Sequence, residues 1–261
     1  MNNDYWQKQD PDAPLFPDIL WEKPERRDLA GKLLIVGGSD GGIHDVAQSF
    51  AAAKEAGIGE ARALVPESLK SITKHIEGID FLPATNTGNF SHSASDQLIF
   101  MAGQMGGVLL PGNIGRNSET AMLLADLLRS YSGKLSITKD AVDALYGEAD
   151  KLIKRPDTLL VVSFAQLQRL AKEVKSEIVF RSDLDFLIFI ERLHAFSLQH
   201  PAMIITKHHN QMLFACNGQV ITTERKDLNE LWCVDVASRA IVYWLQHPNL
   251  PTQAISTSLI P

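Results

Sequence analysis

Short apolar runs alternate with amphipathic stretches along most of the chain from residue 31 onward. Runs such as Lys32 to Val36 and Thr158 to Ser163 are rich in Val, Ile and Leu, which is typical of strands that are buried on both faces. The stretches between them place apolar residues at helical spacing, as the leucines between 123 and 128 do after Ser118. Strands that alternate with helices predict an α/β fold with a parallel sheet.

The predicted elements follow one another without a long linker, so we expect residues 31–261 to form one domain. The predicted strands cover 32–36, 61–65, 107–110, 134–138, 158–163, 202–206, 211–216 and 219–223. The predicted helices cover 45–56, 67–77, 96–104, 119–129, 140–145, 165–174, part of 176–198, and 235–245. Residues 1–30 combine prolines with aromatic residues, which predicts an extended N-terminal arm that packs through its aromatic side chains.

The first predicted strand leads into a glycine-rich turn, Gly-Gly-Ser-Asp-Gly-Gly, at residues 37–42. A helix is predicted directly after this turn. Free backbone N–H groups at a helix N-terminus favour anions, so the turn indicates a phosphate or another anionic ligand. The alternative is a turn whose glycines only allow close packing of the strand against the helix.

Composition narrows the classes of function. A net charge of −6 and a pI near 5.7 argue against nucleic acid as a general partner. The longest apolar runs are shorter than the roughly 20 residues that span a bilayer, so we expect no membrane partner. Two cysteines without a charged and apolar leader indicate the cytoplasm. The histidines and cysteines lack metal-ligand spacing, and no metal site is expected.

Three separated segments carry a family resemblance. They are Gly-Gly-Ser at 37–39 with an alanine-rich helix after it, Pro-Gly-Asn-Ile-Gly-Arg at 111–116, and 138–145, where either Asp140 or Asp143 matches an acidic position. Together they resemble the ribokinase-like family, and within it the carbohydrate-kinase-type domain of ADP/ATP-dependent NAD(P)H-hydrate dehydratases. The second segment resembles the family's Gly-Pro-Gly-Leu-Gly-Arg turn, with one extra residue and Leu110 in place of the leading glycine.

The resemblance implies a ribokinase-like three-layer α/β/α sandwich with a mainly parallel central sheet. It implies a nucleotide or dinucleotide as the small-molecule ligand, ADP or ATP with Mg²⁺ as cofactors, and a homo-oligomer. The substrate contacts that it implies come from the two glycine turns, at Gly38, Ser39, Gly112, Asn113 and Gly115.

The chain departs from the family where the family performs its chemistry. Residues 161–170 align without gaps on the family's Thr-Pro-His-Pro-Gly-Glu-x-x-Arg-Leu, with Ser163 in place of the histidine and Gln166 in place of the glutamate. The segment that resembles the family's strand ending in Lys-Gly keeps Lys207, but His208 replaces the glycine.

The family's Gly-Thr-Gly-Asp motif, an anion hole that precedes a catalytic aspartate, corresponds to residues 232–235, Trp-Cys-Val-Asp. Glycines let consecutive N–H groups converge on a phosphoryl group, in dihedrals that Val234 populates poorly. Loss of one such donor costs about 100-fold or more in rate. Asp235 remains as the candidate catalytic base, and its alternative role is the N-cap of the helix over 236–245. The resemblance implies phosphate contacts from Lys207, Val234 and Asp235.

Three functions follow from these observations. The first is a degenerate relative of the hydrate dehydratases that keeps nucleotide or dinucleotide binding with weak or no catalysis. The second is an active NAD(P)H-hydrate dehydratase or small-molecule kinase that uses Asp235. The third is a structural or interaction subunit whose glycine turns serve packing alone.

Overall fold

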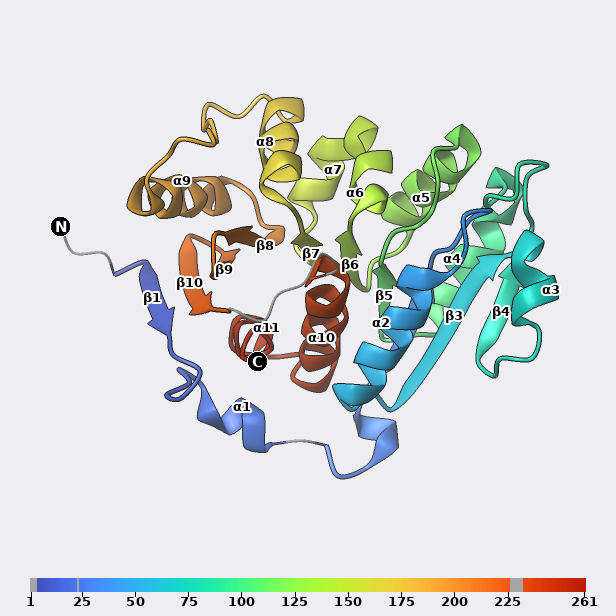
Figure 1. Ribbon diagram of the computed structural model, residues 1–261, viewed down its shortest axis with the longest axis horizontal. Helices are drawn as coiled ribbons and strands as arrows, with labels where there is room; N and C mark the ends of the chain where they lie inside the picture. The colour runs from blue at the N-terminus through green and yellow to red at the C-terminus, as the bar shows by residue number, and fades with distance from the viewer. Residues whose placement is uncertain (1–3, 23, 226–231) are drawn as a thin grey trace.

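The computed structural model describes residues 4–22, 24–225 and 232–261, and a ten-stranded sheet forms the centre of this part of the chain (Figure 1). The strand order is β1-β10-β9-β8-β7-β6-β5-β2-β3-β4. The strands from β4 to β8 pair in parallel, β9 is antiparallel to β8 and β10, and β1 is parallel to β10. The predicted mainly parallel α/β sheet is therefore confirmed. The strands are β1 (Trp6–Gln9), β2 (Lys32–Val36), β3 (Glu60–Pro66), β4 (Ile79–Leu82), β5 (Gly107–Leu110), β6 (Lys134–Thr138), β7 (Thr158–Val161), β8 (Met203–His208), β9 (Gln211–Cys216) and β10 (Gln219–Glu224).

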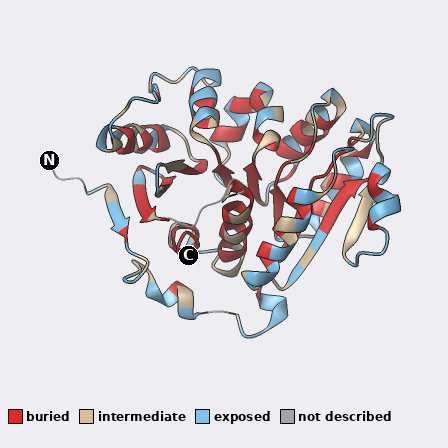
Figure 2. Cartoon of the chain, in the orientation of Figure 1, coloured by how far each residue is buried: buried red, intermediate tan, exposed pale blue. Residues whose placement is uncertain are grey.

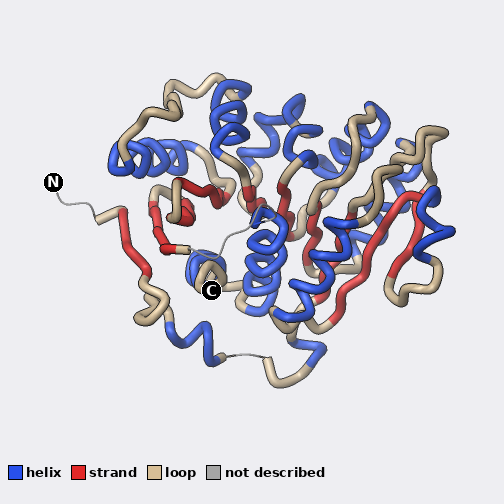
Figure 3. The backbone as a smooth tube through the Cα atoms, in the orientation of Figure 1, coloured by secondary structure: helices blue, strands red, loops and turns tan. Residues whose placement is uncertain are grey.

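Helices cover both faces of the sheet and give the three layers (Figure 3). One face carries α4 to α9, and the other carries α2, α10 and α11. The helices are α1 (Pro17–Trp21), α2 (His44–Glu55), α3 (Lys70–Thr73), α4 (Ser95–Gly103), α5 (Ser118–Ser130), α6 (Asp140–Ala144), α7 (Ala149–Lys154), α8 (Phe164–Glu173), α9 (Phe186–Gln199), α10 (Trp232–Gln246) and α11 (Pro251–Thr257). Short 3₁₀ turns lie at Arg27–Leu29, Glu67–Leu69, His92–Ala94 and Tyr146–Glu148.

The side chains of β2 show how one apolar run supplies two cores. Leu34 and Val36 belong to the core beneath α4 to α9, whereas Leu33 and Ile35 belong to the core beneath α2 and α10. All four side chains are buried, and Figure 2 shows the central strands buried along their length. Burial of each such side chain contributes about 1.5–3 kcal/mol. A strand between two helical layers therefore reads as a continuous apolar run.

The N-terminal arm adds a strand to the sheet. β1 pairs with β10, and the Trp6 indole donates a hydrogen bond to Thr222 Oγ1 at 3.0 Å. Tyr5 stacks on His194 of α9, with 3.9 Å between the ring centroids. The buried Gln9 side chain donates to the carbonyl oxygen of Ser256 at 2.9 Å. The arm thus closes the sheet edge that β10 would otherwise expose.

Several local features differ from the predictions, among them α7 and α11, which were not predicted. The helix predicted over 67–77 is a 3₁₀ turn followed by the short α3, and the chain then reverses at Gly78, whose φ is 85°. β4 was not predicted. α10 includes Trp232, so it begins at least three residues before the predicted start at Asp235. Within the described residues, no helix is both long and apolar enough to cross a lipid bilayer.

Candidate functional site

The carboxyl ends of the parallel strands gather most of the residues that the sequence singles out (Figure 1). The glycine turn 37–42 follows β2, the turn 111–116 follows β5, Lys139 follows β6, and Lys207 lies near the end of β8. Ligands of open α/β sheets bind at this edge, where loops from neighbouring strands meet. We therefore take this edge as the candidate site and refer to it as the cleft edge.

The two glycine turns are hydrogen-bonded to each other. Asn113 Nδ2 donates to the carbonyl oxygen of Gly42 at 2.9 Å, and Ser39 Oγ lies 3.3 Å from Asn113 Oδ1. Ser39 is 3% exposed, and Gly38 is buried beside it. Asn113 itself has a φ of 55°, so this residue of the second turn takes a left-handed conformation. The structure thus brings the predicted substrate-contacting residues together.

A protein carboxylate faces the backbone of the second turn. Asp140 Oδ2 accepts a hydrogen bond from the Ile114 N–H at 3.0 Å, and the amides of Asn113 and Gly115 also stabilise this carboxylate. Burial raises the pKa of Asp140 against the opposite effect of these amides. Of the two acidic residues that match the family position, Asp140 supports the turn, whereas Asp143 is exposed.

An ion pair joins the start of α2 to the end of β6. Lys139 Nζ lies 2.6 Å from Asp45 Oδ2, and the Asp45 side chain is only 4% exposed. Lys139 has a φ of 53° and a ψ of −137°, a conformation that costs a non-glycine residue about 1–3 kcal/mol. Gln166 Nε2 donates to the Lys139 carbonyl oxygen at 2.7 Å. Gln166 also forms a capping box with Ser163 at the start of α8, which holds its side chain in place.

Gly112 makes room for this pair. Its φ is 108°, and a Cβ built there would lie 2.8 Å from both Asp140 Oδ1 and Lys139 Cβ, and 3.2 Å from Asp45 Oδ2. Only glycine fits at this distance without displacing its neighbours. The space above Gly112 is therefore filled by side chains of the protein itself.

The first turn of α10 lies beside the same edge. Asp235 Oδ1 accepts a hydrogen bond from Gln48 Nε2 of α2 at 2.7 Å. Because α10 includes Trp232, Asp235 lies inside the first turn and is not the N-cap that one interpretation of the sequence expected. Val234 is fully buried, and Trp232 packs against the core beneath α2 and α10.

Two lysines lie near Cys233, the second residue of α10. Burial raises the pKa of the Cys233 thiol to about 11, while the charges of Lys139 and Lys207 and a contact with Thr138 act to lower it. Lys207 is half-buried, and its side chain forms no ion pair or hydrogen bond with another residue in the described part of the chain. Lys139, Lys207 and the first turn of α10 therefore converge.

Sequence reasoning missed Asp45, Gln48 and Lys139. Lys139 carried a usable signal, because it directly follows a predicted strand at the edge where ligands bind. Asp45 and Gln48 carried none, because a helix position does not reveal which distant residue it faces.

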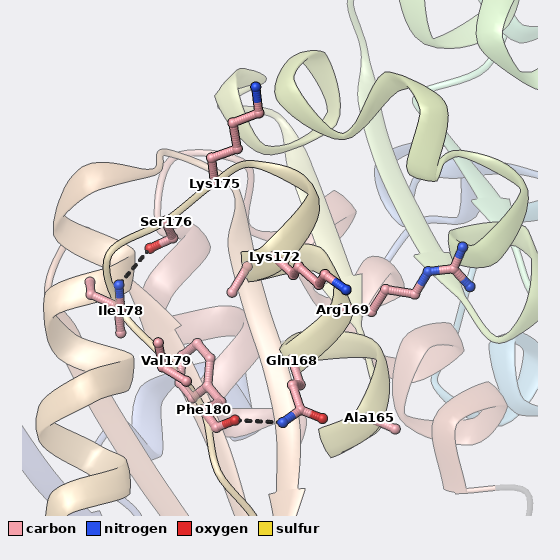
Figure 4. A pocket seen from close by; sticks show the side chains of 10 residues that line it. Ala165, Gln168, Arg169, Lys172, Lys175, Ser176, Ile178, Val179 and Phe180 are labelled. Carbon is pink, nitrogen blue, oxygen red and sulfur yellow. Dashed lines mark hydrogen bonds between the residues drawn. The ribbon is translucent and has the colours of Figure 1, made fainter.

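A separate hollow of about 650 Å³ lies between α8 and the segment that follows it (Figure 4). Gln168 Nε2 donates to the Phe180 carbonyl oxygen at 2.8 Å and ties the segment to the helix. The residues lining this hollow include none of the predicted site residues. Across the described residues, no group of three or more His, Cys, Asp or Glu side chains is arranged to hold a metal ion.

Comparison with known proteins supports the fold. No family model and no curated protein sequence matches the chain. A ribokinase-like superfamily protein (EF1790) from Enterococcus faecalis V583 superposes over 100% of this chain and 87% of its own, with a TM-score of 0.73 and 12% identity. An ADP/ATP-dependent NAD(P)H-hydrate dehydratase from Bacillus subtilis, co-crystallised with ATP/Mg²⁺, covers 92% of this chain and 80% of its own, with a TM-score of 0.60 and 11% identity. The pyridoxal kinase from Staphylococcus aureus, in complex with AMP-PCP and pyridoxal, gives a TM-score of 0.52 at 12% identity, over 86% of this chain and 83% of its own. The chain therefore has the ribokinase-like fold.

Proposed function

We propose that this chain binds a nucleotide or dinucleotide at the cleft edge and has little or no catalytic turnover, as a degenerate relative of the NAD(P)H-hydrate dehydratases. The fold neighbours include a dehydratase co-crystallised with ATP/Mg²⁺ and a kinase in complex with a nucleotide analogue, which supports the choice of ligand. The single observation that carries the proposal is the helical first turn of α10 at residues 232–235.

That turn is poorly suited to stabilise a transferring phosphoryl group. The N–H groups of an α-helical first turn can attract an anion. The family's motif instead uses glycine dihedrals in which successive N–H groups converge on the transferring group, and this helical turn does not adopt them. Val234 and Cys233 are 0% and 8% exposed, so their packing holds the helical conformation. With several donors lost at about 100-fold or more each, turnover falls far below that of an enzyme with the glycine motif.

The candidate base is also engaged. A general base must lie within hydrogen-bond reach of the proton that it removes. Asp235 Oδ1 instead accepts from Gln48 Nε2. This contact fixes one of the two carboxylate oxygens against α2.

Mg²⁺ fits the site only as a companion of the nucleotide. Mg²⁺ usually binds through one or two carboxylates together with substrate phosphates. Asp45 is paired with Lys139, and Asp140 is bound to backbone amides, so of these two and Asp235 it is Asp235 that we assign to a nucleotide-bound ion. The phosphates would supply the remaining ligands.

Calorimetric titration of the full chain with ADP, ATP and NADPH tests the binding. We expect heat with at least one of them, and no heat with any would refute the binding and favour the interaction subunit. Incubation with hydrated NADPH and ADP or ATP, followed by NADPH absorbance, tests the turnover. Absorbance that rises with the wild type but not with Asp235→Asn would establish the active dehydratase instead. A homo-oligomer and a cytoplasmic location remain predictions, which chromatography with light scattering and cell fractionation test.

A further inference from the structure

The ammonium group of Lys139 has unused hydrogen-bonding capacity. A lysine carries three N–H donors, and in the described residues Asp45 is the one acceptor that Lys139 Nζ has. The lysine side chain is 34% exposed, whereas the Asp45 side chain is 4% exposed. The buried carboxylate therefore fixes a cation whose other donors can reach a ligand.

The backbone of Lys139 is held in place at some cost. Its φ of 53° and ψ of −137° are unfavourable for a residue with a Cβ. Such a conformation persists only where contacts with the surrounding residues hold the backbone in it. The surroundings here are the Gln166 hydrogen bond to the Lys139 carbonyl oxygen, the ion pair with Asp45, and the packing of Gly112 against Lys139 Cβ. Contacts from α8, from α2 and from the turn 111–116 together fix the position of Lys139.

Lys207 and the N-terminus of α10 lie at the same edge of the sheet as Lys139. Lys139 follows β6 and Lys207 lies near the end of β8, with only β7 between these strands. Lys207 shares the sheet face of Ile205, which belongs to the core beneath α10, and α10 packs against β6 and β7. The charges of both lysines act on the Cys233 thiol in the first turn of α10. The positive end of a 15-residue helix adds to their field. Asp235 Oδ1 is held by Gln48, which directs that oxygen toward α2.

From this geometry we infer that Lys139, oriented by Asp45, binds the anionic group of the cleft ligand together with Lys207. The ligand class is a di- or triphosphate, or another compact polyanion. The inference rests on the proposed function only in placing the ligand at the cleft edge. It adds Lys139 as a residue that contacts the ligand and Asp45 as the residue that positions Lys139.

Titration of the full chain with inorganic pyrophosphate and with ATP tests this. A hydrogen bond to a charged group contributes about 1.5–3 kcal/mol, so Lys139→Gln is expected to weaken binding by about tenfold or more. Lys134→Gln is the control, because it makes the same change at the opposite end of β6. It should change the binding constant by less than about twofold, which is the usual effect of a substitution distant from the site.

Removing the lysine alone leaves Asp45 buried without a partner, which destabilises the fold. The double variant Asp45→Asn/Lys139→Gln removes both charges and should also lose binding, with circular dichroism to confirm that it folds. Asp45→Asn alone keeps the ammonium charge but loses the contact that orients it, so it should weaken pyrophosphate binding by less than Lys139→Gln does. If the pair were purely structural, none of these variants would change pyrophosphate binding once folded.

The outcomes separate this inference from the proposed function. If ATP binds equally to the wild type and to the double variant, the role of Lys139 is refuted and the proposed function stands. If pyrophosphate binds and depends on Lys139 while ADP, ATP and NADPH do not bind, the inference stands and the proposed function fails. If the wild type binds neither pyrophosphate nor a nucleotide, both are refuted.

Discussion

Gly112 is the position where one added methyl group tests the architecture of the cleft edge. In Gly112→Ala the new Cβ would lie 2.8 Å from Asp140 Oδ1 and from Lys139 Cβ, closer than real Cβ contacts come. The φ of 108° adds a backbone cost of about 1–2 kcal/mol for a residue with a Cβ. Overpacking of this kind costs about 1–3 kcal/mol more. We expect the free energy of unfolding to fall by about 2–5 kcal/mol.

Urea denaturation followed by circular dichroism measures this change. The midpoint should fall at an unchanged m value, and Tm should fall by about 4–20 °C. Gly103→Ala is the matched control, because Gly103 ends α4 without a positive φ and a Cβ there meets nothing within 4 Å. We expect that variant to be as stable as the wild type, or up to about 1 kcal/mol more stable.

The same variant separates two roles for Gly112. If the glycine exists to let the backbone approach a ligand, as the family resemblance implies, Gly112→Ala should lose nucleotide binding at nearly unchanged stability. If it exists to accommodate Asp140 and Lys139, stability should fall first. A wild-type urea midpoint for Gly112→Ala would refute the packing argument.

Three further results are expected. The hydrogen bond from His92 foremost lowers the pKa of Asp126, so this contact stabilises the fold above the ordinary pKa of aspartate, and the stabilisation is lost as the pH falls through the lowered value. Asp126→Asn should cost under about 1 kcal/mol in urea unfolding at pH 7 and progressively less as the pH falls below about 4, and a pH-independent difference would contradict this. Burial raises the pKa values of Cys216 and Cys233, so a thiol reagent at pH 8 should label both slowly in the native protein and rapidly in urea; fast native labelling would contradict their burial. The Arg155 guanidinium donates to two carbonyl oxygens in the turn before β6, so Arg155→Met should lower the free energy of unfolding by about 1–3 kcal/mol, and an unchanged urea midpoint would show that water replaces these bonds.

The central strands could be predicted from the sequence because their environment is uniform. β2, β5, β6 and β9 have the predicted bounds. Each is almost entirely buried, so apolar residues predominate in β2, β5 and β9, and β6 keeps Leu135 and Ile137 between polar residues. The local pattern therefore carries the information that defines the strand.

The edge strands could not be predicted in this way. β1, Trp-Gln-Lys-Gln, has one apolar residue and becomes a strand because β10, more than 200 residues away, offers unpaired backbone groups. β4 is mostly half-buried and pairs only with β3. Edge strands take their structure from the neighbour, and a local pattern does not contain that neighbour.

The loops of the cleft edge could be predicted from the sequence, but the contacts between its side chains could not. The two glycine turns could be found because glycine marks a strand end wherever it occurs. The pairing of Asp45 with Lys139 depends on β5 lying between β2 and β6, and this strand order is a property of the whole sheet. The contact of Gln48 with Asp235 likewise requires α10 to pack beside α2.

An anion that enters the cleft edge meets two kinds of hydrogen-bond donor, backbone amides and the Lys139 ammonium group. The free energy needed to make these donors available differs between the two. The amides of the turn 111–116 already face the Asp140 carboxylate, so a ligand phosphate there would have to displace a half-buried carboxylate. Leaving that carboxylate without its hydrogen bonds costs about 1–3 kcal/mol. Lys139 offers donors without any displacement, because its bond to Asp45 uses one of three. A phosphate is therefore expected on the α10 side of the site, while the turn 111–116 holds the end of β6 in place and contacts a ligand through side chains such as Asn113.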